Sequence, residues 1–234
     1  MSEQRQQQIQ TRLAALREDV REWCLQYSRD PAGVAILAVS KRFPVSDIQA
    51  AAAAGQQRFG ESYLSEALAK QEALASLGLE WHFIGPLQSN KTRRIAERFD
   101  WVHGIDRIKL ARRLSEQRPA GLRPLNICVQ VNVSGETTKS GCAPAATAEL
   151  AHAVAELPGL RLRGLMTLPA RTHDFGEQRR AFARLRELQE ALQAEGLALD
   201  TLSMGMSGDI EAAIAEGSTL LRIGTGIFGP RPDR

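Results

Sequence analysis

The chain has 234 residues, of which 43% are hydrophobic and 24% are charged. These values are ordinary for a globular protein that buries its own core, and they exclude disorder on a large scale. Lys and Arg outnumber Asp and Glu by 30 to 27, and the basic residues are scattered rather than gathered in one segment. This pattern argues against nucleic-acid binding.

The N-terminus and the cysteines indicate where the protein resides. The first ten residues, MSEQRQQQIQ, are polar and lack an apolar signal core, and no apolar stretch is long enough to cross a bilayer. Cys24, Cys128 and Cys142 are widely spaced, which suits reduced thiols. The four histidines show no metal-ligand spacing, either among themselves or with the cysteines. We therefore expect a cytoplasmic protein without a membrane anchor and without a metal.

The chain alternates between helical and apolar segments. Apolar residues recur at helical spacing from Ile9 to Tyr27, so residues 1–30 are expected to form an amphipathic helix that covers part of a core. Short apolar runs follow, separated by loops and by helical stretches, several of which end at glycine. The runs number eight and cover residues 34–40, 57–60, 81–85, 101–105, 126–133, 162–168, 199–205 and 220–229.

Strands that alternate with helices form a parallel sheet, because a parallel neighbour requires a long crossover connection. The repeated units predict a closed (β/α)₈ barrel of the TIM type over residues 31–234, and the length matches the roughly 250 residues of such barrels. An open doubly wound sheet is the alternative. The first run lacks the G-x-G-x-x-G that a dinucleotide-binding sheet carries there, so we predict one barrel domain with an extra N-terminal helix.

Lys41 follows the first run and would lie at the carboxyl end of the first strand. Functional groups of barrels gather at this end, so its amine is expected to point into the barrel mouth. Partial desolvation would lower the pKa of that amine and favour the neutral nucleophile that forms a Schiff base with an aldehyde. A surface lysine that extends into water is the competing interpretation.

Two glycine-rich loops follow the last two runs, SMGMSGD at 203–209 and RIGTGIFG at 222–229. Many barrels bind phosphate at these positions, where glycine lets the backbone approach an anion and hydroxyls donate to it. Tight turns chosen for steric reasons are the alternative. The predicted phosphate ligands are Ser207, Gly208, Gly224 and Thr225.

A phosphate-bearing aldehyde that is linked to lysine suggests pyridoxal phosphate. Arg222 would then face the pyridine nitrogen, disfavour its protonation and weaken the ring as an electron sink. A strand-end arginine in a salt bridge is the alternative. Met204, like Met166 and Met206, is expected in the core or as a soft wall against the cofactor ring.

Seven motifs together resemble the YggS/PROSC family of pyridoxal phosphate homeostasis proteins: AVSK, FGESY, WHFIGPLQSNK, QVNVSGETTKSG, RGLMTLP, LSMGMSGD and STLLRIGTGIFG. The resemblance runs from Val34 to Gly229. It implies a fold type III barrel similar to the N-terminal domain of alanine racemase, without the second domain. It places the family's lysine on Lys41, its pyridine-facing arginine on Arg222 and its phosphate loops on the four ligands named above. Ser62 stands where the family usually has asparagine.

The resemblance and the residues favour a carrier or regulator over an enzyme. The two tyrosines, Tyr27 and Tyr63, lie on or beside helices, so no strand end offers a tyrosine as a second base for racemisation. We expect a monomer that holds pyridoxal phosphate as an internal aldimine, serves apo-enzymes that require this cofactor and has no robust catalysis of its own. The alternatives are a weak amino-acid racemase that uses pyridoxal phosphate and a Schiff-base aldolase acting on a sugar phosphate.

Two further motifs have open interpretations. His82 is expected as a core histidine whose ring bonds to the backbone, although a position at the barrel mouth is the alternative. The long polar loop that holds Asn132, Lys139 and Ser140 is expected to be either an exposed connection or a lid over the site.

Overall fold

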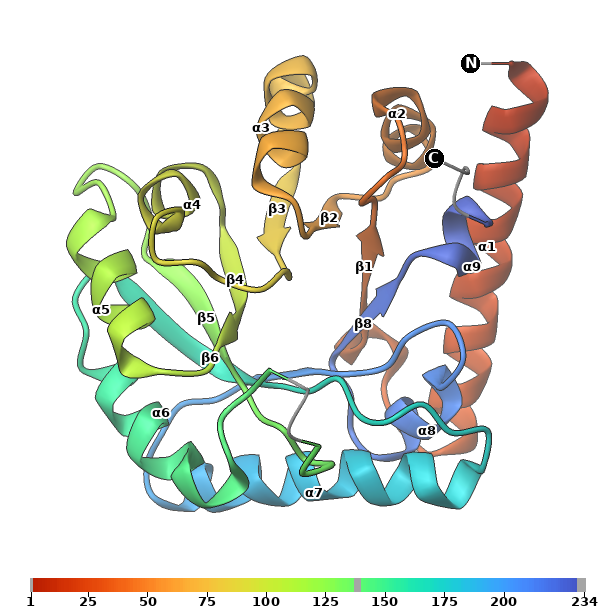
Figure 1. Ribbon diagram of the computed structural model, residues 1–234. Coiled ribbons are helices and arrows are strands. Elements are labelled where there is room, and N and C mark those ends of the chain that lie inside the picture. Colours follow the sequence, from red (N-terminus) through yellow and green to blue (C-terminus); the bar gives the residue numbers. More distant parts are fainter. Residues whose placement is uncertain (1, 137–139, 231–234) are drawn as a thin grey trace.

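The computed structural model describes residues 2–136 and 140–230. Within these residues, eight parallel strands close into a barrel in which each strand pairs with its neighbours in the sequence (Figure 1). Closure is completed by β1 and β8, which pair from Ala35 with Leu220 to Ala38 with Ile223. The predicted closed barrel is therefore confirmed, and the open sheet is excluded. The strands are β1 (Ala35–Val39), β2 (Arg58–Glu61), β3 (Glu80–Phe83), β4 (Trp101–Ile105), β5 (Leu125–Gln130), β6 (Leu160–Met166), β7 (Thr201–Ser203) and β8 (Leu220–Ile223).

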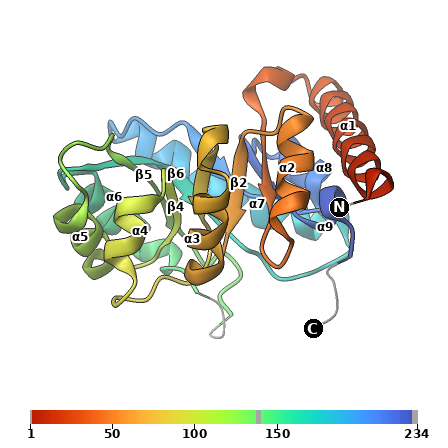
Figure 2. The same ribbon diagram turned by 90° about the horizontal axis from the view of Figure 1, so that it is seen from above.

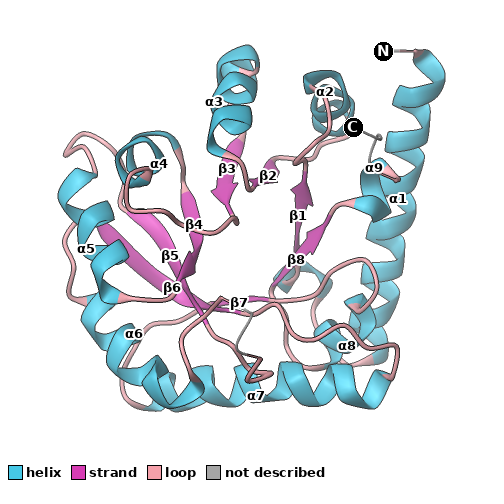
Figure 3. Cartoon of the chain, in the orientation of Figure 1, coloured by secondary structure: helices cyan, strands magenta, loops and turns pink. Residues whose placement is uncertain are grey.

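Helices surround the strands on the outside of the barrel (Figure 3). In the described part of the chain, none of them is both long and apolar enough to cross a membrane. The α-helices are α1 (Glu3–Gln26), α2 (Val45–Ala53), α3 (Leu64–Ala73), α4 (Thr92–Arg98), α5 (Ile108–Gln117), α6 (Thr147–Ala155), α7 (Phe175–Ala194), α8 (Ile210–Ala215) and α9 (Thr225–Phe228). Short 3₁₀ turns cover Pro31–Gly33, Ala75–Leu77 and Pro144–Ala146.

The strands are buried on both faces, as expected when a parallel sheet closes inside a ring of helices. Every residue of β4 is buried. Outward-facing residues such as Val102 join the main core between strands and helices, whereas Trp101, Cys128 and Met166 form a separate apolar cluster. The barrel interior is thus a compartment of its own, and polar side chains share it.

Helix α1 lies along one side of the barrel, beside α2 and α8 in the view from above (Figure 2). Its apolar stripe is buried at Ile9, Leu13, Leu16, Val20 and Cys24. Near its start, the Arg5 guanidinium bonds to the buried carboxylate of Asp47 and to the carbonyl oxygen of Phe228, 2.8 Å away. The helix therefore ties the C-terminal end of the described chain to α2.

The last predicted strand is too long in the sequence-based assignment. Residues 220–229 were expected to be one run, but β8 ends at Ile223 and residues Thr225–Phe228 form the short helix α9. Ile227 and Phe228 are apolar because they are buried in the helical core, where the Phe228 ring lies 4.9 Å from that of Phe43. An apolar run of this length does not distinguish a strand from a strand followed by a buried turn of helix.

Candidate functional site

A cavity of about 650 Å³ opens at the carboxyl ends of the strands. Lys41 enters it after β1, Met166 at the end of β6 and Arg222 from β8. The loops after β7 and β8 close another side with residues 206–209 and 224–225. Six of the seven residues that the sequence predicted as cofactor ligands therefore line one cavity.

Lys41 is half-buried where the chain leaves β1. Its Nζ lies 3.4 Å from Ser62 Oγ, so this serine offers a polar contact to the lysine. The next residue, Arg42, has a φ of 68°, which a side chain with a Cβ rarely adopts. Its N–H donates to Glu66 Oε1 at 2.6 Å, which supports the sharp turn directly after Lys41.

A buried ionic network lies behind Lys41. Lys70 Nζ donates to the carbonyl of Ser40 at 2.8 Å and to the carboxylate of Glu61 at 2.7 Å, and it also bonds to Glu66. The Ser40 hydroxyl donates to the same Glu61 oxygen at 2.7 Å. Burial raises the pKa of Glu61, although the charge of Lys70 opposes this. The network holds Ser40, which precedes Lys41, and the end of β2, which precedes Ser62. It therefore fixes the chain on both sides of the contact between Lys41 and Ser62.

The two glycine-rich loops are joined at the cavity. Ser207 Oγ accepts from the Gly226 N–H and lies within hydrogen-bond distance of Thr225 Oγ1, both at 3.2 Å. Ser207, Gly208 and Thr225 are exposed toward the opening. A Cβ placed at Gly208 would meet no atom within 4 Å. The loops therefore leave space bordered by two hydroxyls, as a phosphate cradle requires.

Arg222 is only 4% exposed, yet it lines the cavity. Its Nη1 donates to the carbonyl and the hydroxyl of Ser203, the latter at 2.8 Å, and its Nη2 donates to the carbonyl of Thr167 at 2.7 Å. Within the described chain these partners are neutral, so they do not form the salt bridge of the alternative interpretation. Burial lowers the pKa of Arg222 to about 10, which leaves the guanidinium charged at neutral pH.

The structure does not bring Met204 to the cavity, and the assignment of this residue as a cofactor ligand is corrected. Met204 is fully buried in the main core, whereas Met166 and Met206 line the cavity. The reason is the alternation of side chains along a strand. Ser203 points into the barrel toward Arg222, so its neighbour Met204 points out toward the helices.

The remaining candidates divide between the core and the loops. His82 is fully buried, as predicted, but its ring bonds to the side chains of Glu80 and His103 rather than to the backbone. Lys139 of the proposed lid lies outside the described residues.

The cavity is also lined by four residues from the loop before α7 and the first turns of that helix: Arg171, Thr172, His173 and Gln178. Sequence reasoning missed these four, and their polar character is the one signal that the sequence offered. Among the residues described, no group of three or more His, Cys, Asp or Glu side chains is arranged to hold a metal ion.

Comparison with known proteins defines the class of barrel. The sequence profile of the alanine racemase N-terminal domain matches residues 12–232. A curated pyridoxal phosphate homeostasis protein of Pseudomonas aeruginosa is 60% identical over 223 residues, which cover 95% of this chain and 96% of that protein. The protein of the same name from Escherichia coli K12 is 50% identical over 222 residues, which cover 94% and 95%. The chain belongs to the pyridoxal phosphate homeostasis protein family, as its motifs predicted.

Solved structures agree with this assignment. PipY of Synechococcus elongatus, solved with pyridoxal phosphate bound, is 39% identical and superimposes with a TM-score of 0.82 over 95% of this chain and all of that one. Alanine racemase of Corynebacterium glutamicum is 18% identical with a TM-score of 0.69, and the match covers 94% of this chain and 62% of that one. The second comparison supports the fold alone.

Proposed function

We propose that the chain binds pyridoxal phosphate through Lys41 and acts in homeostasis of this cofactor as a carrier or regulator. The observation that carries the proposal is the convergence of a lysine amine, a buried guanidinium and two hydroxyl-bearing glycine loops on one cavity. The names of the curated relatives and the cofactor bound to PipY support it.

The residues of the cavity fit the functional groups of the cofactor. Lys41 would hold the cofactor through its aldehyde carbon, because a lysine amine in the cavity is the group that can form a Schiff base. Ser207 and Thr225 would hold the phosphate through their hydroxyls, and the open space at Gly208 would admit its oxygens. Arg222, which lines the same cavity, would face the ring of the cofactor. Bound pyridoxal phosphate supplies an electron sink, and the positive charge of Arg222 limits it by disfavouring a proton on the ring nitrogen.

The same arrangement favours a carrier over a racemase. Tyrosine is absent from the described lining of the cavity, so no phenol stands ready as a second base. We infer a cytoplasmic monomer that passes the cofactor to apo-enzymes; the three buried cysteines, which form no disulfide with one another, are compatible with this compartment. We also infer that the chain is organised as a 1–30 helix on a 31–234 barrel.

Reduction with borohydride tests the proposal. The purified protein is incubated with pyridoxal phosphate, reduced, digested and mapped by mass spectrometry. Lys41 is expected to carry the adduct, and Lys41→Arg is expected to lose both the adduct and the visible absorbance while keeping its cooperative melt. An adduct on Lys70 or Lys91 in place of Lys41 would overturn the site. Steady conversion of one amino-acid enantiomer to the other by the loaded protein would instead support the racemase.

A further inference from the structure

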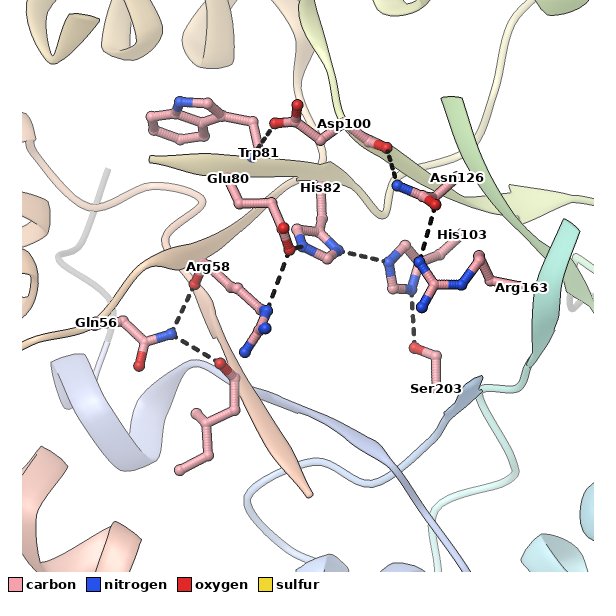
Figure 4. Close-up of polar contacts among 11 residues, drawn as sticks. Gln56, Arg58, Glu80, Trp81, His82, Asp100, His103, Asn126, Arg163 and Ser203 are labelled. Atoms are coloured by element: carbon pink, nitrogen blue, oxygen red, sulfur yellow. Dashed lines mark hydrogen bonds and ion pairs between the residues drawn. The ribbon is translucent and has the colours of Figure 1, made fainter. Parts of the chain in front are cut away.

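A continuous line of polar side chains crosses the barrel interior from Glu80 to Arg222. Figure 4 shows its course from Glu80 through His82 and His103 to Ser203. Branched apolar residues usually dominate such an interior. Here four hydrogen bonds join five side chains. They connect Arg222 Nη1 to Ser203 Oγ at 2.8 Å, Ser203 Oγ to His103 Nδ1 at 2.8 Å, His103 Nε2 to His82 Nδ1 at 2.9 Å, and His82 Nε2 to Glu80 Oε1 at 2.7 Å.

The line brings together strands that are far apart in the sequence. Glu80 and His82 lie two residues apart on β3, and His103 lies on the neighbouring strand β4. The bond from His103 to Ser203 then joins β4 to β7, which are not paired in the sheet, over a sequence separation of 100 residues. The line therefore runs through the barrel rather than around it.

When both imidazole rings are neutral, the donor and acceptor properties of the two ends set the direction of every hydrogen bond. A guanidinium only donates and a carboxylate only accepts. Arg222 therefore donates to Ser203, whose hydroxyl donates to Nδ1 of His103. The Nε2–H of His103 donates to Nδ1 of His82, and the Nε2–H of His82 donates to Glu80. Each atom on the line is satisfied when both rings are neutral and carry their proton on Nε2.

Burial supports neutral rings. It lowers the pKa of His103 well below the usual 6.5, and the charges of His82 and Arg222 act in the same direction. Burial also lowers the pKa of His82, against the hydrogen bond and the charge of Glu80. The other charged groups that act on His82 are Asp100, which raises its pKa, and Arg58, which lowers it.

We propose that Glu80, His82, His103 and Ser203 are positioning residues that orient Arg222 and transmit to it the charge of a carboxylate at the opposite end of the barrel. The proposal rests on the proposed function, because Arg222 matters here as the charge beside the cofactor ring. Glu80 is the partly exposed end of the line, where it also pairs with Arg58 at 3.2 Å. Hydrogen bonds in series polarise one another, so a change at Glu80 is expected at Arg222.

The first test uses the cofactor-free protein. Nitrogen chemical shifts of the imidazoles at about pH 7.5 distinguish the two neutral tautomers from the charged ring. Both His82 and His103 are expected as neutral Nε2–H rings. A charged ring, or an Nδ1–H tautomer at either residue, would overturn the proposed line. This measurement does not depend on cofactor binding, so it decides on the line even if pyridoxal phosphate fails to bind.

The second test compares Glu80→Gln with Asp200→Asn in protein loaded with pyridoxal phosphate. The amide of Glu80→Gln still accepts from His82 but removes the negative charge. Less of the Arg222 charge is then offset, so the bound cofactor should lose its proton at a lower pH. The pH midpoint of its absorbance change should fall by about 0.5 unit or more, roughly a threefold loss in the proton affinity of the cofactor. Asp200 pairs with Arg163 at 2.7 Å, outside the line, so its neutral variant makes the same charge change without touching these hydrogen bonds.

The outcomes separate the two proposals. An equal midpoint shift in both variants would show a general charge effect and overturn the role of the line, as would no shift in Glu80→Gln. A shift with Ser203→Ala that Ser203→Thr reverses would support the line, because threonine restores the hydroxyl. Failure of the unmodified protein to form the coloured adduct would contradict the proposed function. The tautomer measurement would still show whether the line of hydrogen bonds exists.

Discussion

Gly208 is the residue at which phosphate binding is most cleanly tested. It lines the cavity, its φ is not in the left-handed region and an added Cβ would meet no atom within 4 Å. Gly208→Asp should therefore fold normally and place a negative charge where the phosphate is expected. Affinity for pyridoxal phosphate should fall at least about tenfold, or about 1.4 kcal/mol, as measured by titration of the visible absorbance.

Pyridoxal and a second glycine provide the controls. Pyridoxal lacks the phosphate, so its weaker binding should change little in Gly208→Asp. Gly121 likewise has open space around an added Cβ and no left-handed φ, but it does not line the cavity. Gly121→Asp should bind pyridoxal phosphate like the parent protein. Equal affinities of the parent for pyridoxal and its phosphate would show that the two loops are only turns.

Lys70 is expected to be the most costly lysine to replace. It and Glu61 are buried together, and within the described residues Glu61 Oε2 already has no hydrogen-bond partner. Lys70→Met would leave the carboxylate buried without its counter-charge, which costs about 3–5 kcal/mol in comparable pairs. Urea unfolding followed by circular dichroism measures the loss. The double variant Lys70→Met, Glu61→Leu should recover most of it, and failure to recover would mean that packing rather than charge is responsible.

The sequence predicts single residues well where strand position alone decides the outcome. Lys41 and Arg222 were expected at the mouth because they lie at strand ends, and they line the cavity. The hydrogen bond between His103 and Ser203 was not predictable, because it depends on which inward residues of two unpaired strands reach the same level. Met204 shows the same limit, since a shift of one residue changes which face it occupies.

At the scale of elements, the start of α7 controls part of the cavity wall. The carboxylate of Asp174 accepts from the N–H of Glu177 at 2.7 Å and caps the helix, and Thr172 donates to the Glu177 side chain at 2.6 Å. Asp174→Ala should lower the free energy of unfolding by about 1 kcal/mol. Asp174→Asn keeps a cap and should lose much less in the same urea titration. Equal losses would indicate that the charge of Asp174, rather than its capping bond, stabilises the helix.

Elements were predictable where an apolar run has clear ends. The run at 101–105 coincides with β4, because polar loops bound it on both sides. The runs at 199–205 and 220–229 extend beyond β7 and β8, since their ends contain glycines and apolar residues that leave the sheet. Those same glycines shape the candidate site. The strand ends are therefore predicted least accurately where the chain leaves the sheet to form the site.

At the scale of the whole molecule, the barrel joins two ends with different chemistry. One end carries the cavity, and the other carries the ion pairs of Glu80 with Arg58 and of Asp200 with Arg163. The number and spacing of βα units predicted closure, because such units have few other ways to bury both faces of a sheet. The polar interior has no comparable signal, since inward and outward residues of a fully buried strand follow no simple pattern of hydropathy.

The buried histidines should make the stability of the whole molecule depend on pH. Burial lowers the pKa of His82 and of His103 below the usual 6.5, so in acid the unfolded chain binds protons that the folded chain does not. The free energy of unfolding should therefore fall as pH drops below about 6.5, by up to about 1.4 kcal/mol per pH unit for each ring. Glu61 acts oppositely, because its raised pKa lets the folded chain bind a proton more readily as pH approaches 4.5.

A comparison of variants separates the contribution of the histidines to the pH dependence of stability from that of Glu61. His103→Gln should be less stable than the parent at neutral pH, since it breaks two buried hydrogen bonds, but its stability should fall less steeply between about pH 7 and pH 5.5. Urea titrations at several pH values give these slopes. If parent and His103→Gln share one slope, the His103 ring takes up a proton inside the folded barrel as readily as in the unfolded chain, and its neutral state in the interior is refuted.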